Sequence, residues 1–383
     1  MKKIRILLTG GGTGGHIYPL IAVAQNLKKI TKDEADLYYL GSEHPLNEEF
    51  EKLGVKIYKL ASSKIRRYFD FRNFSDIPKF FWSLLQAFSR LYALMPDVVF
   101  SKGGPGSFPV VLAARFYFIP VIIHDSDSVP GFANRLAASF AVRIGISFKG
   151  AALFLPTKKL ILAGNPIRPE LLGEQIKISE AKEALRFKPQ EPLILVLGGS
   201  QGAQRLNNFI FENLGAFLEV AQVYHQAGDR NVSESEENVS LALKNVPESL
   251  RARYKMIGEL DVREMKYALS AADLVISRAG AGAIFEIAAF GKPSILIPLD
   301  GSANEHQKSN AYEYVENARL PDGQSAAVVI EETNFKINIV LVQIKKILEN
   351  ETLTQKMSEA AKKFAKLDAA EILAKEILIL AQK

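Results

Sequence analysis

Residues 277–310 read SRAGAGAIFEIAAFGKPSILIPLDGSANEHQKSN, and this stretch decides the fold. An apolar run at 274–276 leads into it, and a second apolar run at 294–297 lies within it. Each run predicts a buried strand that turns through a polar or glycine-rich loop into a helix. Two such units side by side point two helix N-termini at one place. Backbone N–H groups and the positive end of the helix dipole make that place suited to phosphate.

Three residues of this stretch are candidates for binding a ligand that carries a phosphate and a ribose: Gly280, Gly282 and Glu286. The two glycines leave room for a ligand beside the backbone. A glutamate early in the following helix is a suitable partner for a ribose diol. The alternative is that the glycines only make a tight turn and that the glutamate is a solvated surface residue.

Composition limits the class of protein. A chain of 383 residues suits two α/β domains, and 48% apolar with 23% charged residues is typical of a globular protein. The absence of cysteine excludes disulfides and thiolate metal sites. The apolar start of the chain is too short for a signal peptide, and the longest apolar run, residues 108–123, is interrupted by Arg115 and Pro120. We therefore expect a cytoplasmic protein.

Short apolar runs alternate with helical patterns along the chain, which predicts doubly wound parallel sheets. The first series comprises strands at residues 4–9, 37–40, 56–60, 98–101, 121–124, 143–146 and 160–162. The second series comprises strands at residues 193–197, 222–226, 254–257, 274–276, 294–297 and 326–328. Two prolines and a glycine at 164–170 suggest a boundary between domains at 1–165 and 166–365. Ligands of such sheets bind at the carboxyl ends of the strands, so a cleft between the two domains is the expected site.

Three further glycine-rich loops follow predicted strands: residues 10–16 (GGGTGGH), 103–109 (GGPGSFP) and 198–207 (GGSQGAQRLN). The first has neither the context of a dinucleotide motif nor the lysine of a P-loop. Five glycines exceed what a turn needs, which favours a ligand close to the backbone. His16 ends this loop and could reach a substrate hydroxyl, or it could bond its own loop.

Residues 124–135 (HDSDSVPGFANR) also follow a buried strand. Asp125 and Asp127 form a D-x-D pattern that could hold Mg²⁺ with a diphosphate. The alternatives are that one carboxylate orients or deprotonates an acceptor hydroxyl, or that it bonds the loop itself. Because helix N-termini could neutralise a diphosphate without a cation, we expect a metal-independent protein.

Seven lysines or arginines lie between residues 56 and 79, interleaved with aromatic residues that continue through Trp82. Such a mixture suits an anionic membrane surface or single-stranded nucleic acid. No RNA-binding signature accompanies it, and residues 80–94 have the spacing of an amphipathic helix. The remaining alternative is that the aromatic residues are core and the charges solvated.

The sequence resembles the MurG-type UDP-N-acetylglucosamine transferases of peptidoglycan synthesis from residue 10 to about residue 311. The motifs that carry the resemblance, in order, are GGTGGHIYPLIAVAQNL, GGPGSFP, GNPIR, GGSQGAQRLN, AGAGAIFEIAAFGKPSILIPL and HQKSNA. The family usually has H-E-Q-N where this chain has His124, Asp125, Ser126 and Asp127. The resemblance implies a GT-B fold, two Rossmann-like domains facing a cleft, with the last helix (366–383) crossing back to the first domain.

The resemblance also implies roles for individual residues. The donor UDP-GlcNAc would be bound by Arg168, Ser200, Gln201, Gly202, Val262, Gly280, Gly282, Glu286, His306 and Gln307. The acceptor diphosphate would be held by Gly11, Gly12, Thr13, Gly14, Gly15, Gly103, Gly104, Gly106 and Asn134. His16 is the first candidate for the general base, with Asp125 or Asp127 the second.

The implied reaction is inverting transfer of GlcNAc to the C4 hydroxyl of undecaprenyl-diphospho-MurNAc-pentapeptide, at the cytoplasmic face of the bacterial membrane. The implied partners are UDP-GlcNAc, the lipid-linked muramoyl pentapeptide and an anionic membrane surface, with no nucleic acid. Three alternatives remain open. They are a GT-B transferase with another lipid acceptor such as diacylglycerol, a non-catalytic nucleotide-sugar or polyprenyl-phosphate binder, and an NAD-dependent oxidoreductase.

Overall fold

The computed structural model describes residues 3–11, 14–44, 46–61, 72–104, 106–199, 203–228, 232–302 and 305–382, without the side chains of 72–77 and 232–236. The chain forms two compact units, one of Met1–Pro169 with Lys366–Lys383 and one of Glu170–Ala365. The division falls four residues after the expected boundary at 165, and the C-terminal helix belongs to the first unit.

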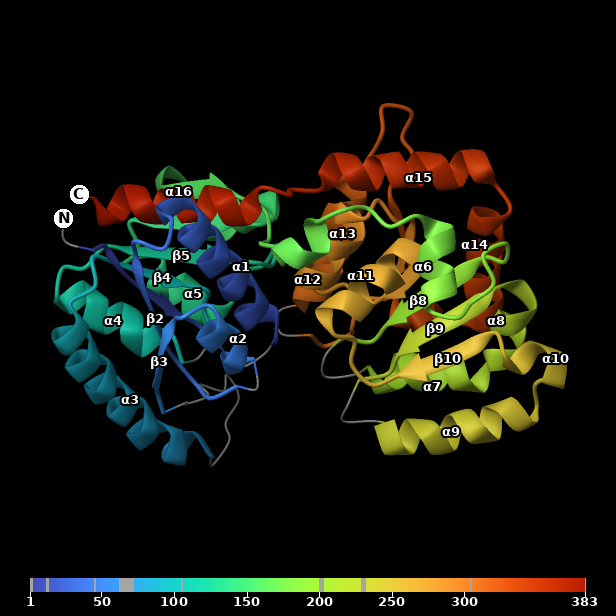
Figure 1. Ribbon diagram of the computed structural model, residues 1–383, viewed down its shortest axis with the longest axis horizontal. Coiled ribbons are helices and arrows are strands. Elements are labelled where there is room, and N and C mark those ends of the chain that lie inside the picture. The colour runs from blue at the N-terminus through green and yellow to red at the C-terminus, as the bar shows by residue number, and fades with distance from the viewer. Residues whose placement is uncertain are drawn as a thin grey trace. The chain divides into compact units, whose positions relative to one another are not determined.

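A seven-stranded parallel sheet with the order β3-β2-β1-β4-β5-β6-β7 organises the first unit (Figure 1). Its inner strands are mostly apolar, as expected for a parallel sheet covered on both faces, whereas the edge strand β3 reads KIYK and is only partly buried. The strands are β1 (Arg5–Thr9), β2 (Asp36–Gly41), β3 (Lys56–Lys59), β4 (Val98–Ser101), β5 (Val121–Asp125), β6 (Arg143–Ile146) and β7 (Leu160–Leu162).

The helices of the first unit are α1 (Gly14–Thr31), α2 (Asn47–Lys52), α3 (Arg72–Leu94), α4 (Phe108–Phe116), α5 (Phe132–Ala137) and α16 (Ala369–Ala381). The last of these, α16, lies beside α1 (Figure 1). Leu373 and Ile377 of α16 are fully buried in the same core as β1 and α1. The end of the chain therefore completes the core of the unit in which the chain begins.

The second unit has a six-stranded parallel sheet with the order β10-β9-β8-β11-β12-β13. Its strands are β8 (Leu193–Leu197), β9 (Gln222–Gln226), β10 (Tyr254–Ile257), β11 (Leu274–Ser277), β12 (Ser294–Leu296) and β13 (Ala327–Val329). Its helices are α6 (Ile178–Ala184), α7 (Gln204–Glu212), α8 (Leu214–Val220), α9 (Val232–Lys244), α10 (Glu248–Arg251), α11 (Val262–Ala271), α12 (Ala281–Ala289), α13 (His306–Asn317), α14 (Ile337–Leu348) and α15 (Glu351–Phe364). Each of the strands expected from the sequence is present to within one residue at either end.

In both sheets the strand order reverses at the strand that comes first in the chain. In the first unit β1 lies between β2 and β4, and in the second unit β8 lies between β9 and β11. Helices connecting strands on opposite sides of such a point cover opposite faces of the sheet and leave a crevice at the strands' carboxyl ends. All four glycine-rich loops follow the strands that flank these two points. The topology therefore gives each unit one place for a ligand.

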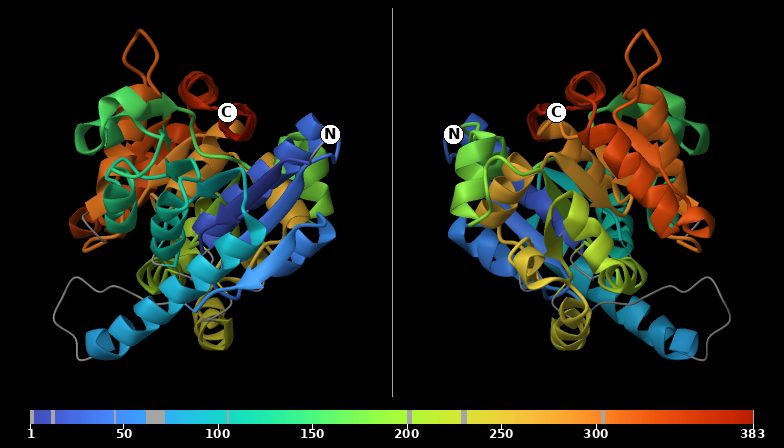
Figure 2. Two further views of the ribbon diagram at one scale, coloured as in Figure 1. Left: turned by 90° about the vertical axis from the view of Figure 1, so that its left-hand side faces the viewer. Right: turned by 90° about the vertical axis from the view of Figure 1, so that its right-hand side faces the viewer.

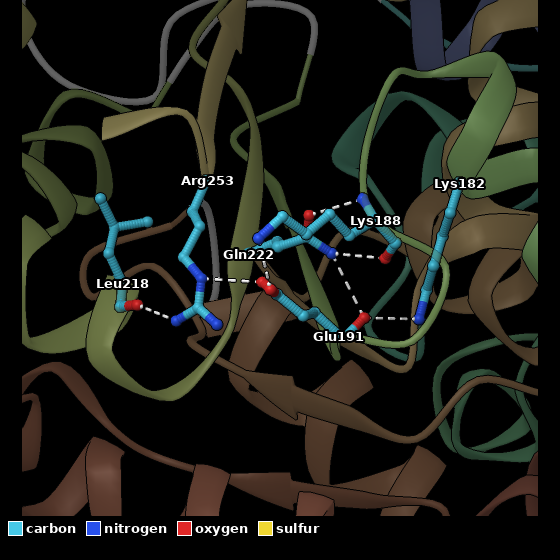
Figure 3. A network of polar contacts seen from close by, with 6 residues as sticks. All are labelled: Lys182, Lys188, Glu191, Leu218, Gln222 and Arg253. Atoms are coloured by element: carbon cyan, nitrogen blue, oxygen red, sulfur yellow. Dashed lines mark hydrogen bonds and ion pairs between the residues drawn. The ribbon is translucent and has the colours of Figure 1, made fainter. Parts of the chain in front are cut away.

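The amino-terminal edge of the second sheet carries a polar network that is shown in Figure 3. Lys182, which is buried, pairs with Asp273 at 2.7 Å and donates to the Glu191 carbonyl at 2.8 Å. The Glu191 carboxylate accepts from Arg253 Nε at 2.8 Å, and Gln222 donates to the Lys188 carbonyl at 2.9 Å. This network ties strand beginnings together at the edge opposite the glycine-rich loops, so it stabilises the unit away from the candidate site.

Helix α3 runs along the flank of the first unit and is drawn light blue in Figure 2. It packs against α4 and has 23 residues, beginning eight residues before the amphipathic stretch predicted at 80–94. Within the described part of the chain, no helix is both long and apolar enough to cross a membrane. The predicted basic and aromatic residues at 62–71 lie outside the described residues.

Candidate active site

The β1–α1 and β4–α4 loops of the first unit pack directly on one another. Gly104 has a positive φ of 92°, and a Cβ there would lie 2.7 Å from the carbonyl oxygen of Gly11, whose φ is 144°. Backbone N–H of Lys102 donates to the Thr9 carbonyl at 2.9 Å. The fold itself thus requires some of these glycines, which the sequence analysis had taken as an excess that pointed to a ligand.

The other predicted glycines of these loops differ from one another, and Gly103, with a φ of 87°, would place a Cβ 2.5 Å from Asn134 Oδ1. Gly14 and Gly15 begin α1, where Gly14 is buried and Gly15 is exposed. A Cβ at Gly106 would meet no atom within 4 Å. Gly12 and Thr13 lie outside the described residues, so their predicted contacts with a diphosphate stay predictions.

Asp125, at the end of β5, organises the loop that follows it. Its buried carboxylate accepts from the Asp127 N–H at 3.0 Å, the Gly131 N–H at 3.1 Å and Asn134 Nδ2 at 2.8 Å. Burial, and next the charge of Asp127, raise the pKa of Asp125. Asn134 also donates to the His124 carbonyl at 3.1 Å and is buried. Between the two candidate carboxylates, this geometry favours a loop-building role for Asp125 and leaves Asp127 as the candidate for chemistry.

His16, the third residue of α1, is half-buried. Burial and then the charge of Lys102 lower its pKa to about 4, while the charge of Asp127 acts in the opposite direction. The imidazole is therefore neutral at pH 7 and can accept a proton. The negative charge of Asp127 would stabilise the imidazolium that forms.

Lys102 is a site residue that the sequence analysis missed. It follows β4, is fully buried, and donates through Nζ to Ser126 Oγ. Burial lowers its pKa to about 8, while Asp125 and Asp127 oppose that shift. The signal was present in the sequence, since a lysine directly after the short strand VVFS enters the carboxyl edge of the sheet, where its side chain has no route to solvent.

In the second unit, the β11–α12 loop leaves open space above its glycines. Gly280, the residue before α12, has an ordinary φ of −69°, and Gly282 lies in the first turn. A Cβ at either position would meet no atom within 4 Å. Because neither backbone geometry nor packing requires a glycine here, the tight-turn explanation fails for these two residues. Glu286 lies in the second turn and is half-buried.

Replacing Gly282 or Gly104 by alanine should change the free energy of unfolding in different ways. Gly282→Ala should leave stability unchanged or raise it by about 0.5–1 kcal/mol, because alanine is the better helix former. Gly104→Ala should cost about 1–3 kcal/mol, because its φ is left-handed and the new methyl group meets Gly11. Urea denaturation of the two variants measures both values. A destabilised Gly282→Ala would mean that the space above α12 is closed.

A buried carboxylate, also missed from the sequence, fixes this loop. Arg278, directly after β11, pairs with Glu332 at 2.6 Å and donates to the Ile297 carbonyl at 3.2 Å. Glu332 also pairs with Arg205 at the start of α7. Glu332 thereby joins α7 to the loop that follows β11, and Arg278 joins that loop to Ile297 after β12.

Three of the remaining predicted donor residues, His306, Gln307 and Val262, lie at the same carboxyl edge of the second sheet. His306 and Gln307 begin α13, and Gln307 Oε1 accepts from the Leu299 N–H at 3.1 Å. Val262 begins α11 after a capping box made by Asp261 and Glu264. Ser200, Gln201 and Gly202 lie outside the described residues.

Arg168, which was also predicted to bind the donor, belongs to the first unit. It is buried, and its guanidinium lies 4.2 Å from the ring centroid of Tyr18 on α1. The sequence analysis had assigned it to the second domain. Its contact with the uracil–phosphate end of a donor stays a prediction.

Among the described residues, the acidic side chains do not gather into a cation site. Across the ranges that the structure describes, no group of three or more His, Cys, Asp or Glu side chains is arranged to hold a metal ion. The D-x-D pattern contributes one carboxylate that already accepts three hydrogen bonds within its own loop.

Comparisons with known proteins cover both units. The glycosyltransferase family 28 N-terminal domain matches residues 6–146, and the family's C-terminal domain matches residues 193–373. The UDP-N-acetylglucosamine–N-acetylmuramyl-(pentapeptide) pyrophosphoryl-undecaprenol N-acetylglucosamine transferase of Clostridium botulinum is 35% identical over 352 residues, covering 91% of this chain and 92% of the relative. The second such transferase of Bacillus anthracis is 36% identical over 353 residues, with the same coverage.

Solved structures agree with this assignment. The crystal structure of Acinetobacter baumannii MurG has a TM-score of 0.71 and 25% identity, covering 99% of this chain and 100% of that one. The UDP-GlcNAc 2-epimerase of Neisseria meningitidis, at 16% identity and a TM-score of 0.68 over 98% of this chain and all of that one, shares the fold alone. The chain belongs to glycosyltransferase family 28, among the MurG-type N-acetylglucosamine transferases.

Proposed function

We propose that this protein transfers N-acetylglucosamine from UDP-GlcNAc to the C4 hydroxyl of the muramoyl sugar in undecaprenyl-diphospho-MurNAc-pentapeptide, with inversion at the anomeric carbon. This is the step from lipid I to lipid II in peptidoglycan synthesis. The observation that carries the proposal is 35% identity, over 91% of the chain, to a transferase named for that donor and acceptor.

The second unit would bind the donor. The open space above Gly280 and Gly282, at the N-terminus of α12, suits the diphosphate. Glu286 would accept hydrogen bonds from the ribose diol, and His306 and Gln307 would read the sugar hydroxyls. Ser200, Gln201 and Gly202 would complete the diphosphate site, with Arg168 and the backbone near Val262 at the uracil end. A methyl group at Gly282 projects into the same space, so Gly282→Ala should fold well and bind UDP-GlcNAc less tightly.

The first unit would bind the acceptor, with its diphosphate held by the residue 11–15 and 103–106 loops and by Asn134. His16 would take the proton from the C4 hydroxyl while the hydroxyl oxygen attacks the anomeric carbon. The bond from that carbon to the diphosphate breaks, and UDP leaves with the electron pair. Backbone N–H groups at the helix ends would stabilise the charge on the leaving diphosphate, and Asp127 would stabilise the imidazolium.

The experiment that tests this function uses radiolabelled UDP-GlcNAc with a panel of acceptors, namely lipid I, diacylglycerol and undecaprenyl phosphate, each with and without EDTA. We expect labelled lipid product and UDP release with lipid I, unchanged by EDTA. Transfer to diacylglycerol would identify the alternative GT-B enzyme. Donor binding without UDP release would identify a non-catalytic binder. Loss of transfer in EDTA would overturn the metal-independent part of the proposal.

An exposed apolar surface of the first unit supports binding to the membrane that carries the acceptor. It comprises residues of α3 and of the end of α4, namely Phe81, Trp82, Leu85, Tyr92, Phe116 and Phe118. The guanidinium of Arg115 lies 5.7 Å from the Phe118 ring centroid, so positive charge borders this α3–α4 surface. Apolar and basic groups together favour an anionic lipid surface. We infer a peripheral protein at the cytoplasmic face of the cell membrane.

Trp82 reports directly on this surface, because it is the only tryptophan in the chain and is 59% exposed. Its fluorescence should shift to shorter wavelength with phosphatidylglycerol vesicles and much less with neutral phosphatidylcholine vesicles. High salt should reduce the shift, because it screens the basic border.

Leu85→Asp and Leu241→Asp make a matched pair for vesicle sedimentation, since the two leucines are 62% and 58% exposed on different units. Only Leu85→Asp should lower sedimentation with the vesicles. Equal behaviour of the pair, or an unshifted Trp82, would remove the α3–α4 surface from membrane contact.

A further inference from the structure

Lys102 is a fully buried cation at the carboxyl end of β4. Moving an ammonium out of water costs several kcal/mol unless nearby groups compensate it. Its backbone is fixed by the hydrogen bond to Thr9, and its Cβ lies 3.1 Å from the place that a Cβ on Gly10 would occupy. The side chain therefore has little freedom to leave this position.

The groups that offset the cost of burying the Lys102 ammonium lie in the loop that follows β5. Lys102 Nζ donates to Ser126 Oγ, which in turn donates to Asn165 Oδ1 at 2.8 Å. The carboxylates on either side of Ser126, Asp125 and Asp127, attract the ammonium. Lys102 thus joins the β4–α4 loop to the β5–α5 loop.

The same ammonium acts on the proposed base. Among the described residues, the titratable groups that interact electrostatically with Lys102 include His16 from α1, His124 and Asp125 from β5, and Asp127 from the following loop. His124 Nε2 lies 2.9 Å from the Gly164 carbonyl oxygen, so this second imidazole is fixed within the first unit. Lys102 lowers the pKa of both histidines.

We propose that Lys102 is a positioning residue for the transfer reaction: packed against Gly10 of the loop that leads into His16, it holds the 125–127 loop in place through Ser126. The proposal rests on the function proposed above. The charge of Lys102, which lowers the pKa of His16, would also set the pH range in which the base works.

Lys102→Met tests this, with Lys182→Met as the matched control. Lys182 is also a buried lysine and pairs with Asp273 at 2.7 Å. It lies at the amino-terminal ends of the strands of the second sheet, away from the candidate site. We expect Lys102→Met to lower kcat about tenfold or more at pH 7. The acidic limb of its kcat–pH profile should move up by about one pH unit or more, because a positive neighbour of the base is gone. Lys182→Met should keep the wild-type limb even if it is less stable.

If Lys102→Met folds and the acidic limb of its kcat–pH profile does not move, the proposal is overturned. A rise in the KM for the acceptor with no other change also overturns it, because it would mean that Lys102 binds the acceptor diphosphate. Should Lys102→Met fail to bind UDP-GlcNAc, Ser126→Ala is the second test. A smaller upward shift of the acidic limb of the kcat–pH profile in Ser126→Ala supports the proposal. An acidic limb at the wild-type pH overturns it.

Histidine NMR tests the effect of Lys102 on His16 independently of the proposed transferase activity. The chain has five histidines, and the His16 resonance is identified by its loss in His16→Gln. His16 should titrate at higher pH in Lys102→Met than in wild type, whichever acceptor the enzyme uses. An unchanged titration overturns the electrostatic role. An inactive wild type with a shifted titration overturns the proposed function alone.

Discussion

Replacing Glu286 by alanine is expected to raise the KM for UDP-GlcNAc about 10- to 100-fold and to leave kcat nearly unchanged. A carboxylate hydrogen bond to a ribose diol contributes about 1.5–3 kcal/mol, and each 1.4 kcal/mol corresponds to a factor of ten. The ribose does not react, so this interaction is the same in the ground state and the transition state and appears in KM. Steady-state kinetics at saturating lipid acceptor measure it.

Glu316→Ala is the matched control, because it removes a carboxylate from the neighbouring helix α13 with the same change in net charge. It should keep the wild-type KM. Glu286→Gln should lie between wild type and Glu286→Ala, since an amide oxygen still accepts one hydrogen bond. An unchanged KM for Glu286→Ala would remove this residue from the donor site.

His16→Ala should lower kcat by about 10²- to 10⁴-fold, the usual contribution of a general base. The KM for UDP-GlcNAc should change little, because the donor loops belong to the other unit. Since burial and Lys102 lower the pKa of His16 to about 4, the wild-type enzyme should hold its base in the neutral form from pH 8 down to about pH 5 and lose activity below that. A near-wild-type kcat for His16→Ala would mean that the base is another group.

Asp127→Asn distinguishes the two candidate carboxylates. If Asp127 stabilises the imidazolium, the double variant with His16→Ala should lose little more than His16→Ala alone, because residues that act as a unit are not additive. Asp125→Asn should lower stability before it lowers kcat, because three hydrogen-bond donors of its loop lose a charged acceptor. Thermal unfolding measured beside kcat separates these outcomes.

The strands could be predicted from the sequence because a buried parallel strand is an uninterrupted apolar run that ends at a glycine or a polar residue. VVFSKGG and LVISRAG both have this form. The location of the candidate sites followed, since ligands of such sheets bind where strand order reverses, and the resemblance to a known family supplied the donor and the acceptor.

What could not be predicted depends on contacts between distant residues. Glu332 lies more than fifty residues from Arg278, and only the folded chain joins them. Asp125 and Asp127 look alike in the sequence, and only the three donors around Asp125 show that its carboxylate builds the loop. The glycines of the two units also look alike, yet Gly104 is required by its φ of 92° and Gly280 is not.

The most direct test of the central claim is the structure of the product made by the wild-type protein from UDP-GlcNAc and lipid I. NMR of the released disaccharide gives both the anomeric configuration and the linkage position. The proposal predicts a β-linked GlcNAc on the C4 oxygen of the muramoyl sugar. An α-linkage, attachment at another hydroxyl, or no disaccharide from an enzyme that binds UDP-GlcNAc would contradict it.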